Sequence, residues 1–230
     1  MESTLLCNVW EDVKCFLNNE RDEPFYNERE LQVSLALFLE QTQHYKKIYL
    51  EYYVPVKDNN KTKLLEGYVW HSKIKMDLVV VVGDNSYIPI ELKYKTKKIN
   101  EPRVMRFGES IEHINIIKTH GAVDIGCYDF WKDVRRIELV KEHYSKVVGG
   151  IALFLTNDSL YYSPKKENLY YNFRLFEDNN GSKMCWQDDS KTKKNHPNFT
   201  LDHTYSPKWV RENDTKLPMK LKCFYCLIGE

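Results

Sequence analysis

Residues 76–93 read MDLVVVVGDNSYIPIELK, and this stretch decides the fold. Two apolar runs flank the polar segment Gly83–Ser86, which predicts two neighbouring strands joined by a tight turn. Successive side chains of a strand point to opposite faces, so Glu91 and Lys93 are expected to share a face. Asp77 opens the first strand, so its carboxylate should meet these two side chains at the same end of the pair.

The flanking segments predict an α/β domain. Helical spacing of apolar residues runs from about Glu28 to about Gln43, and residues 46–56 (KKIYLEYYVPV) have the β-branched and aromatic content of a strand. Residues 127–144 carry a second helical stripe, and residues 151–158 (IALFLTND) form an apolar run typical of a strand buried on both faces. A strand–helix–strand connection gives a parallel pair, so we expect a mixed central sheet flanked by helices in the order αβββαβ.

Outside this core, about residues 28–156, the sequence is less regular. A short helix is expected around residues 9–17 and another in residues 110–118 (SIEHINIIK). The C-terminal part, about residues 157–230, is expected to be a β-rich extension, with a hairpin at the Asn179–Gly181 turn signal and a last strand in KLKCFYCLI. We predict that all 230 residues belong to a single domain.

Composition limits the class of protein. The chain is 42% hydrophobic, and its 34 basic and 33 acidic residues leave a formal net charge of +1, so any basic surface must be local. We find no leader pattern at Met1 and no apolar run near the ~18 residues of a membrane span. Six cysteines are scattered along the chain, as expected for reduced thiols. These features predict a cytoplasmic protein without membrane association.

The polar residues of the strand pair suit phosphodiester hydrolysis. Mg²⁺ prefers carboxylate and carbonyl oxygens, which Asp77, Glu91 and the backbone carbonyl of Leu92 could supply. A lysine beside the metal can stabilise developing negative charge, and Lys93 fits that role. A solvated strand face would explain each residue alone, but it would not explain their order along the chain.

The preceding helix adds a further acid. Glu28 lies on the same helical stripe as Leu31, Leu35 and Phe38, so it should sit at the edge of the face that packs on the sheet. Glu30 lies roughly 200° around the helix from Glu28. Glu28 is therefore the expected metal ligand from this helix, with Glu30 in reserve.

With these residues in place, the sequence resembles the PD-(D/E)xK nuclease superfamily, the restriction-endonuclease-like fold, and in particular its uncharacterised bacterial members. Asp77 matches the first acid of the motif, Glu91 the second and Lys93 the lysine, while Glu28 in NERELQ is similar to the helix acid of archaeal Holliday-junction resolvases. Met76 replaces the name-giving proline, and no Gln-x-x-x-Tyr element follows Lys93, unlike in the exonuclease branch. The resemblance implies a Mg²⁺-dependent deoxyribonuclease, an endonuclease, in which Mn²⁺ can substitute.

The same resemblance implies DNA as the partner, with the chain acting as a homodimer or as a subunit of a defence or repair system. A second interpretation is a nucleic-acid-binding or assembly subunit on this fold without intrinsic turnover. Basic residues after the motif and in a polar loop are the candidates for contacts with the nucleic-acid backbone: Lys95, Lys97, Lys98, Arg103, Arg106, Lys191, Lys193 and Lys194.

Two further patterns have simpler explanations. Cys223-x-x-Cys226 resembles half a zinc site, but it falls in an apolar strand, so we expect buried thiols and no zinc. Five charged residues of the second helix are expected to form a solvated face with ion pairs within the helix: Asp129, Asp133, Arg135, Arg136 and Glu138. The functional alternative is that Asp129 or Arg136 reaches a phosphate or a neighbouring catalytic group.

Overall fold

The computed structural model describes residues 2–20, 25–57, 65–163, 169–179, 181–187, 194–210, 216 and 220–229. For residues 2, 3, 101–104, 113 and 114 it describes the backbone alone.

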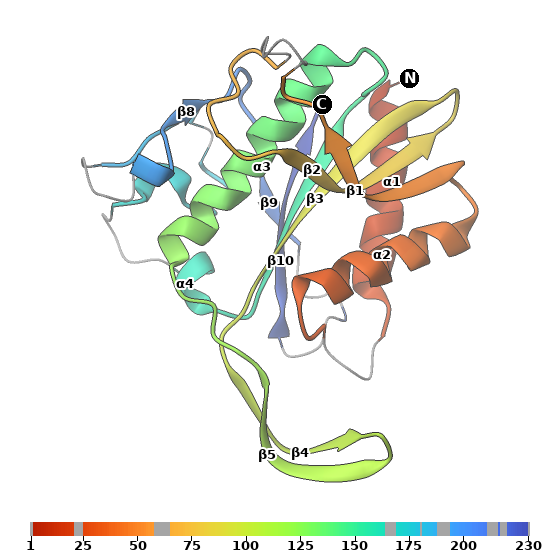
Figure 1. Ribbon diagram of the computed structural model, residues 1–230, viewed down its shortest axis with the longest axis vertical. Coiled ribbons are helices and arrows are strands. Elements are labelled where there is room, and N and C mark those ends of the chain that lie inside the picture. Colours follow the sequence, from red (N-terminus) through yellow and green to blue (C-terminus); the bar gives the residue numbers. More distant parts are fainter. Residues whose placement is uncertain are drawn as a thin grey trace.

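A six-stranded mixed sheet forms the centre of the molecule, in the order β1-β2-β3-β6-β10-β9 (Figure 1). The β3–β6 pair is parallel, and the other neighbours are antiparallel. The fold is therefore α/β with a mixed sheet, as predicted. The strands are β1 (Lys47–Val54), β2 (Ile74–Val82), β3 (Ser86–Lys95), β6 (Gly150–Thr156), β9 (Lys208–Trp209) and β10 (Lys222–Ile228).

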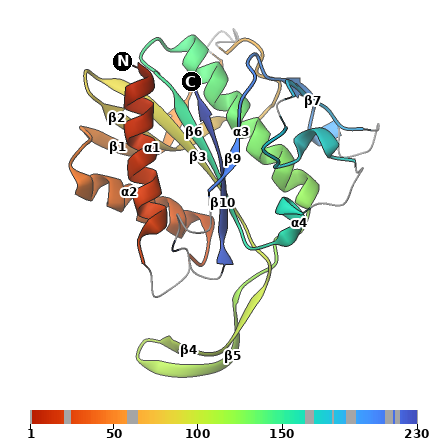
Figure 2. The same ribbon diagram turned by 180° about the vertical axis from the view of Figure 1, so that it is seen from behind.

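Helices cover both faces of this sheet (Figures 1 and 2). Helices α1 (Glu2–Asn18) and α2 (Glu28–Thr42) pack on one face, and α3 (Val123–His143) packs on the other. Each face has its own apolar layer, and every residue of β6 between these layers is buried. Among the described helices, none is long and apolar enough to cross a membrane.

The predicted core elements occur close to their expected bounds, and the last strand is present as β10. The segment expected to be a helix at residues 110–118 is instead β5 (Glu109–Ile117), which pairs with β4 (Ile99–Arg106). The helix prediction was wrong because four isoleucines in this segment favour extended backbone. The Phe107-Gly108 turn, with positive φ at both residues, then suits a tight hairpin.

The hairpin expected around Asn179–Gly181 is also absent from the described residues. This region contains α4 (Ser159–Tyr162), the 3₁₀ turn η1 (Tyr171–Phe173), and β7 (Lys183–Met184), which pairs with β8 (Phe199–Thr200). The aromatic residues pack on α3 and on one another without the predicted hairpin: the rings of Phe173 and Trp186 lie 5.1 and 5.5 Å from that of Tyr128 and 4.7 Å from each other.

Candidate active site

Asp77 lies where β2 and β3 separate. The pairing of these strands runs from Val82↔Ser86 to Leu78↔Ile90. Beyond that point, the backbone N–H of Leu92 donates to Asp77 Oδ2 at 2.7 Å, and the backbone N–H of Asp77 donates to Glu91 Oε2 at 3.4 Å. Side-chain carboxylates therefore accept hydrogen bonds in the place of strand carbonyls, which fixes both acids at the opening of the sheet.

The ladder with β1 is irregular at the same residue. Glu51, which stands opposite Asp77, has a φ of 51°, a left-handed conformation that is uncommon for residues other than glycine. Gln32 of α2 donates through Nε2 to the Asp77 carbonyl at 2.6 Å and to Glu51 Oε1 at 3.2 Å. The alternation of side chains between the two faces of β2 is interrupted at Asp77. Met76 and Leu78 would share a face in a regular strand, but Met76 packs in the α3 layer and Leu78 in the α1–α2 layer.

Of the two acids expected on α2, Glu28 is the one brought to β3. Glu28 Oε2 accepts the backbone N–H of Tyr94 at 2.8 Å. Glu30 belongs to the helix cap: its Oε2 accepts the N–H of Tyr26 at 2.7 Å, and its own N–H donates to Asn27 Oδ1 at 2.9 Å. The geometry therefore makes Glu28 the helix acid that faces the site.

Lys93 forms an ion pair with Asp133, which the sequence had indicated only as part of a solvated helix face. Its Nζ lies 2.5 Å from Asp133 Oδ2 on α3 and donates to the Leu92 carbonyl at 3.1 Å. Arg136, one turn further along α3, places Nη1 3.3 Å from Asp133 Oδ1 and 3.8 Å from Glu91 Oε1. The helix thus contributes a carboxylate and a guanidinium to the site.

The prediction of a solvated charged face on α3 was wrong for three residues. Asp133, Arg135 and Glu138 are 2%, 7% and 1% exposed. Glu138 Oε1 accepts hydrogen bonds from the backbone N–H groups of Asp202 and His203, which are distant in sequence, and Arg135 pairs with Glu138 and Asp202. These partners fold over the helix from the C-terminal part of the chain.

A signal for Asp133 was present in the sequence. The apolar stripe of this helix contains Phe130, Val134 and Ile137, and a residue three positions after Phe130 falls on the same stripe. An acid on the buried stripe of a helix requires a buried partner, because an unpaired charge is costly to desolvate. Lys93, on a neighbouring strand with an expected polar cluster, was the candidate partner.

Burial perturbs the protonation equilibria of the cluster. It raises the pKa of Asp77 to about 6, against the opposing effects of Lys93 and the Leu92 N–H. Burial, together with the charges of Asp133 and Asp77, raises the pKa of Glu91 well above its usual range. Burial alone would lower the pKa of Lys93, but the surrounding carboxylates, Asp133 first, outweigh it and raise that pKa. The lysine is therefore a firmly charged ammonium close to two acids, Asp77 and Glu91, that resist ionisation.

The donor set fits a divalent cation. Glu91 Oε1 is buried and has no hydrogen-bond partner among the described atoms, and it lies in the same opening as the Asp77 carboxylate. A cation between two such acids would offset both their desolvation and their mutual repulsion. A cation site with three side-chain ligands needs three ligand atoms close together. Within the described residues, the three such side chains whose ligand atoms all lie within 4.8 Å of one another are Glu138, Glu142 and His203, and not Asp77, Glu91 and Glu28. Asp77 and Glu91 therefore fit as a pair of ligands, with Glu28 further away.

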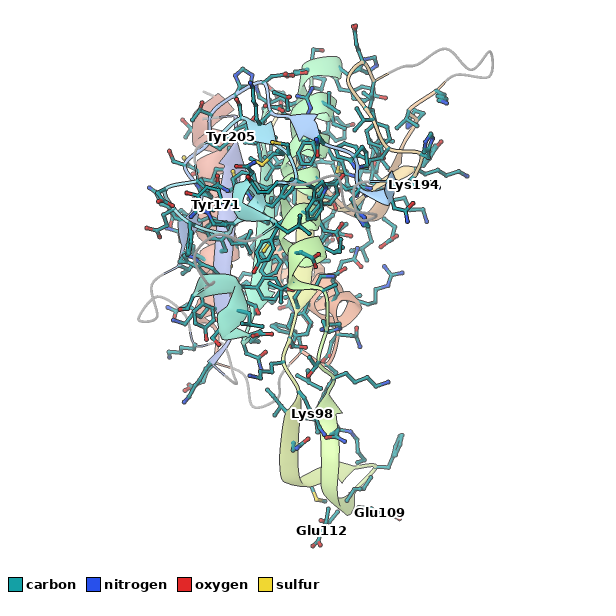
Figure 3. The ribbon with its side chains drawn as sticks, turned by 90° about the vertical axis from the view of Figure 1, so that its left-hand side faces the viewer. Lys98, Glu109, Glu112, Tyr171, Lys194 and Tyr205 are labelled. Carbon is teal, nitrogen blue, oxygen red and sulfur yellow. The ribbon has the colours of Figure 1, made fainter. Side chains whose placement is uncertain are left out.

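The predicted nucleic-acid contacts divide into separate regions. Lys97 and Lys98 are exposed and Lys95 is half-buried, at the end of β3 where the β4–β5 hairpin begins. Arg106 lies near the hairpin tip, whereas Lys194 lies on the main body, away from Lys98 (Figure 3). The side chain of Arg103 and residues Lys191 and Lys193 are outside the described part of the chain.

The two cysteines of the C-x-x-C pattern are buried thiols, as predicted. Cys223 packs in the α1–α2 layer and Cys226 in the α3 layer, so they point to opposite faces of β10. Burial raises the pKa of both thiols.

Comparison of the chain with protein-family models, curated proteins and solved structures found no match. Its function is therefore inferred from the site itself.

Proposed function

We propose that this protein is a Mg²⁺- or Mn²⁺-dependent nuclease with a restriction-endonuclease-like core, and that it hydrolyses phosphodiester bonds of DNA. One observation carries the proposal: the half-buried carboxyl group of Asp77 and the buried carboxyl group of Glu91 meet beside the Lys93 ammonium, where β2 and β3 separate. Perturbed acids around a fixed cationic group are typical of catalytic sites.

The arrangement of elements supports this assignment. Helix α2, strands β1 to β3, helix α3 and strand β6 follow one another in the order of the superfamily core, interrupted by the β4–β5 hairpin. The first acid comes from β2 and the acid–lysine pair from β3, with the helix acid arriving from α2.

Each residue then has a defined role. Asp77, Glu91 and the Leu92 carbonyl would hold the metal ion, which when bound neutralises phosphate charge and activates a water molecule. Glu28, anchored on the Tyr94 N–H, would orient that water. Lys93 would stabilise the charge that develops on the phosphate.

Asp133 and Arg136 position these groups. Asp133 keeps the Lys93 ammonium at the opening, and Arg136 links Asp133 to Glu91. We propose DNA as the substrate, with the chain working as a homodimer or within a defence or repair system.

The test is cleavage of supercoiled plasmid and labelled oligonucleotides with Mg²⁺ or Mn²⁺, against an EDTA control. Asp77→Ala and Lys93→Ala should each lower the cleavage rate by about 10²-fold or more. Asp84→Ala, in the exposed turn between β2 and β3, is the matched control and should cleave normally. Equal cleavage by the wild type and Asp77→Ala would refute the assignment, as would no cleavage of any substrate.

A second candidate function is binding of nucleic acid without turnover. It is favoured by the spacing of the acids: Glu28 does not join Asp77 and Glu91 in a tight three-ligand set among the described residues. Titration calorimetry separates the two functions, because a binding subunit should take up DNA in EDTA and show no heat with Mg²⁺ alone.

A further inference from the structure

The β4–β5 hairpin extends from the body of the molecule (Figure 1). Its base is anchored on both sides: the N–H of Lys98 donates to Thr119 Oγ1 at 2.9 Å, and Thr96 Oγ1 donates to the Lys118 carbonyl at 3.1 Å. The N–H of His120 closes the base by donating to the Thr96 carbonyl at 2.8 Å. These contacts join the two arms of the hairpin, and the N–H of Lys97 ties the base to the segment after β6 by donating to Asn157 Oδ1 at 2.7 Å.

The tip of the hairpin presents apolar side chains to solvent. Phe107 is fully exposed, at 106%, and Met105 and Ile111 are 53% and 40% exposed. Phe107 adopts a φ of 53° and Gly108 a φ of 83°, so the aromatic residue occupies a turn position that glycine or asparagine usually fills. Packing within the described structure does not account for an aromatic side chain there, which points to contact with a ligand.

The hairpin borders the candidate active site at both ends. Its first strand begins at Ile99, four residues after Lys95, which closes β3 just past Lys93. The Arg106 guanidinium near its tip lies 4.7 Å from the ring centre of Tyr26. Tyr26 precedes Glu28 by two residues. Figures 1 and 2 both show the hairpin curving toward the side of the sheet that α1 and α2 cover.

The charge of this segment suits a nucleic-acid partner. Residues 95–118 contain six basic and three acidic residues, while the whole chain has a net charge of only +1. Basic residues beside an exposed aromatic ring are the combination by which proteins bind unpaired strands, with cations on the phosphates and the ring stacked on a base. A protein-binding surface would not need this local excess of positive charge.

We propose that the β4–β5 hairpin holds nucleic acid with unpaired bases over the site, and that Phe107 stacks on an unpaired base. The substrate class is then single-stranded or branched nucleic acid, because a blunt duplex presents few open base faces. This inference rests on the proposed function for the identity of the site, but binding can be measured without cleavage.

The test is fluorescence anisotropy in EDTA with the full chain and three labelled probes: a single strand, a duplex with single-stranded tails, and a blunt duplex. Phe107→Ala should weaken binding of the first two probes on the order of tenfold and leave the blunt duplex nearly unchanged. Phe107→Trp should retain affinity. Tyr171→Ala is the matched control, since Tyr171 is a 40% exposed aromatic on the main body (Figure 3), and its affinity should equal that of the wild type.

The outcomes separate this inference from the proposed function. Equal affinity of wild type and Phe107→Ala for the unpaired probes overturns the hairpin assignment, whether or not the protein cleaves DNA. Phe107-dependent binding without cleavage under Mg²⁺ supports the hairpin and removes the nuclease. Self-association of the wild type that Phe107→Ala abolishes, with unchanged affinity for nucleic acid, would assign the hairpin to a protein interface instead. Wild-type protein that binds none of the probes in EDTA would overturn the hairpin assignment, while the cleavage assay alone decides the nuclease.

Discussion

Replacing Asp77 with asparagine should stabilise the metal-free protein at neutral and alkaline pH. The carboxyl group is ionised in the unfolded chain above pH 4, but burial raises its pKa in the folded protein to about 6. Ionising it therefore costs free energy in the folded state. Asparagine keeps an oxygen that can accept the N–H of Leu92 and carries no charge.

The size of the effect follows from the pKa shift. A rise from 3.8 to about 6, at about 1.36 kcal/mol per pH unit, corresponds to an upper bound of about 3 kcal/mol. The folded state binds the proton more tightly, so its relative stability is greatest below pH 4 and declines as the pH rises through 6. The gain from Asp77→Asn should be absent near pH 4, grow between pH 4 and 6, and be complete above about pH 7.

The measurement is urea or thermal unfolding of both proteins in EDTA at several pH values. For a chain of this length, 3 kcal/mol raises the melting temperature by roughly 6–12 °C. Asp84→Asn, in the exposed turn between β2 and β3, controls for a general effect of removing negative charge and should leave the stability unchanged at every pH. Mg²⁺ should then stabilise the wild type at pH 8 but not Asp77→Asn, because only the wild type keeps both acids.

Two results would refute this reasoning. If Asp77→Asn were less stable than the wild type at pH 8, the carboxylate would be a net source of stability and the burial argument would fail. A gain of the same size at pH 4 and pH 8 would show that the effect is not ionisation of Asp77.

Further predictions concern the packing around the site and of α4. Asp133→Ala should destabilise the protein by about 3–5 kcal/mol in urea unfolding, because it leaves the Lys93 ammonium, whose side chain is only 16% exposed, without its nearest partner. The double variant Lys93→Met/Asp133→Leu should recover most of that loss. A double variant as unstable as the single one would contradict the pairing. Gly126→Ala should cost about 1–3 kcal/mol, because a Cβ there would lie 2.4 Å from the Tyr161 hydroxyl oxygen. Adding Tyr161→Phe should recover part of it, since that buried hydroxyl has no hydrogen-bond partner among the described atoms, and equal melting temperatures of the single and double variants would contradict this.

The strands of the core could be predicted because strands that are buried on both faces have uninterrupted apolar sequences. Val79–Val82 and residues 151–155 lie between two helical layers, and such a position admits almost no polar side chain. The meeting of Asp77, Glu91 and Lys93 followed from strand alternation and a tight turn. Local patterns of this kind suffice where the partner is a neighbour in the chain.

Pairings between distant segments could not be predicted in the same way. Glu138 is buried because backbone N–H groups more than 60 residues later donate to it, and nothing near it in the sequence indicates that. The helix expected at residues 110–118 shows a different limit. A two-stranded hairpin that leaves the sheet has little packing to impose a clear polar–apolar alternation, so the spacing of its apolar residues did not exclude a helix and only its β-branched composition indicated a strand.

The interruption of regular strand pairing at Asp77 links the stability of the site to its proposed chemistry. A regular ladder would use the Leu92 N–H and the Asp77 carbonyl for strand pairing, but here Asp77 Oδ2 and Gln32 occupy them. This leaves the half-buried Asp77 next to the buried Glu91, while Lys93, the positive charge of β3 closest in sequence to Glu91, is already paired with Asp133. The cluster therefore contains more acid than its own cations neutralise. The same excess that should make Asp77→Asn more stable favours binding of a divalent cation by the wild-type site, because the cation would offset the charge that asparagine removes.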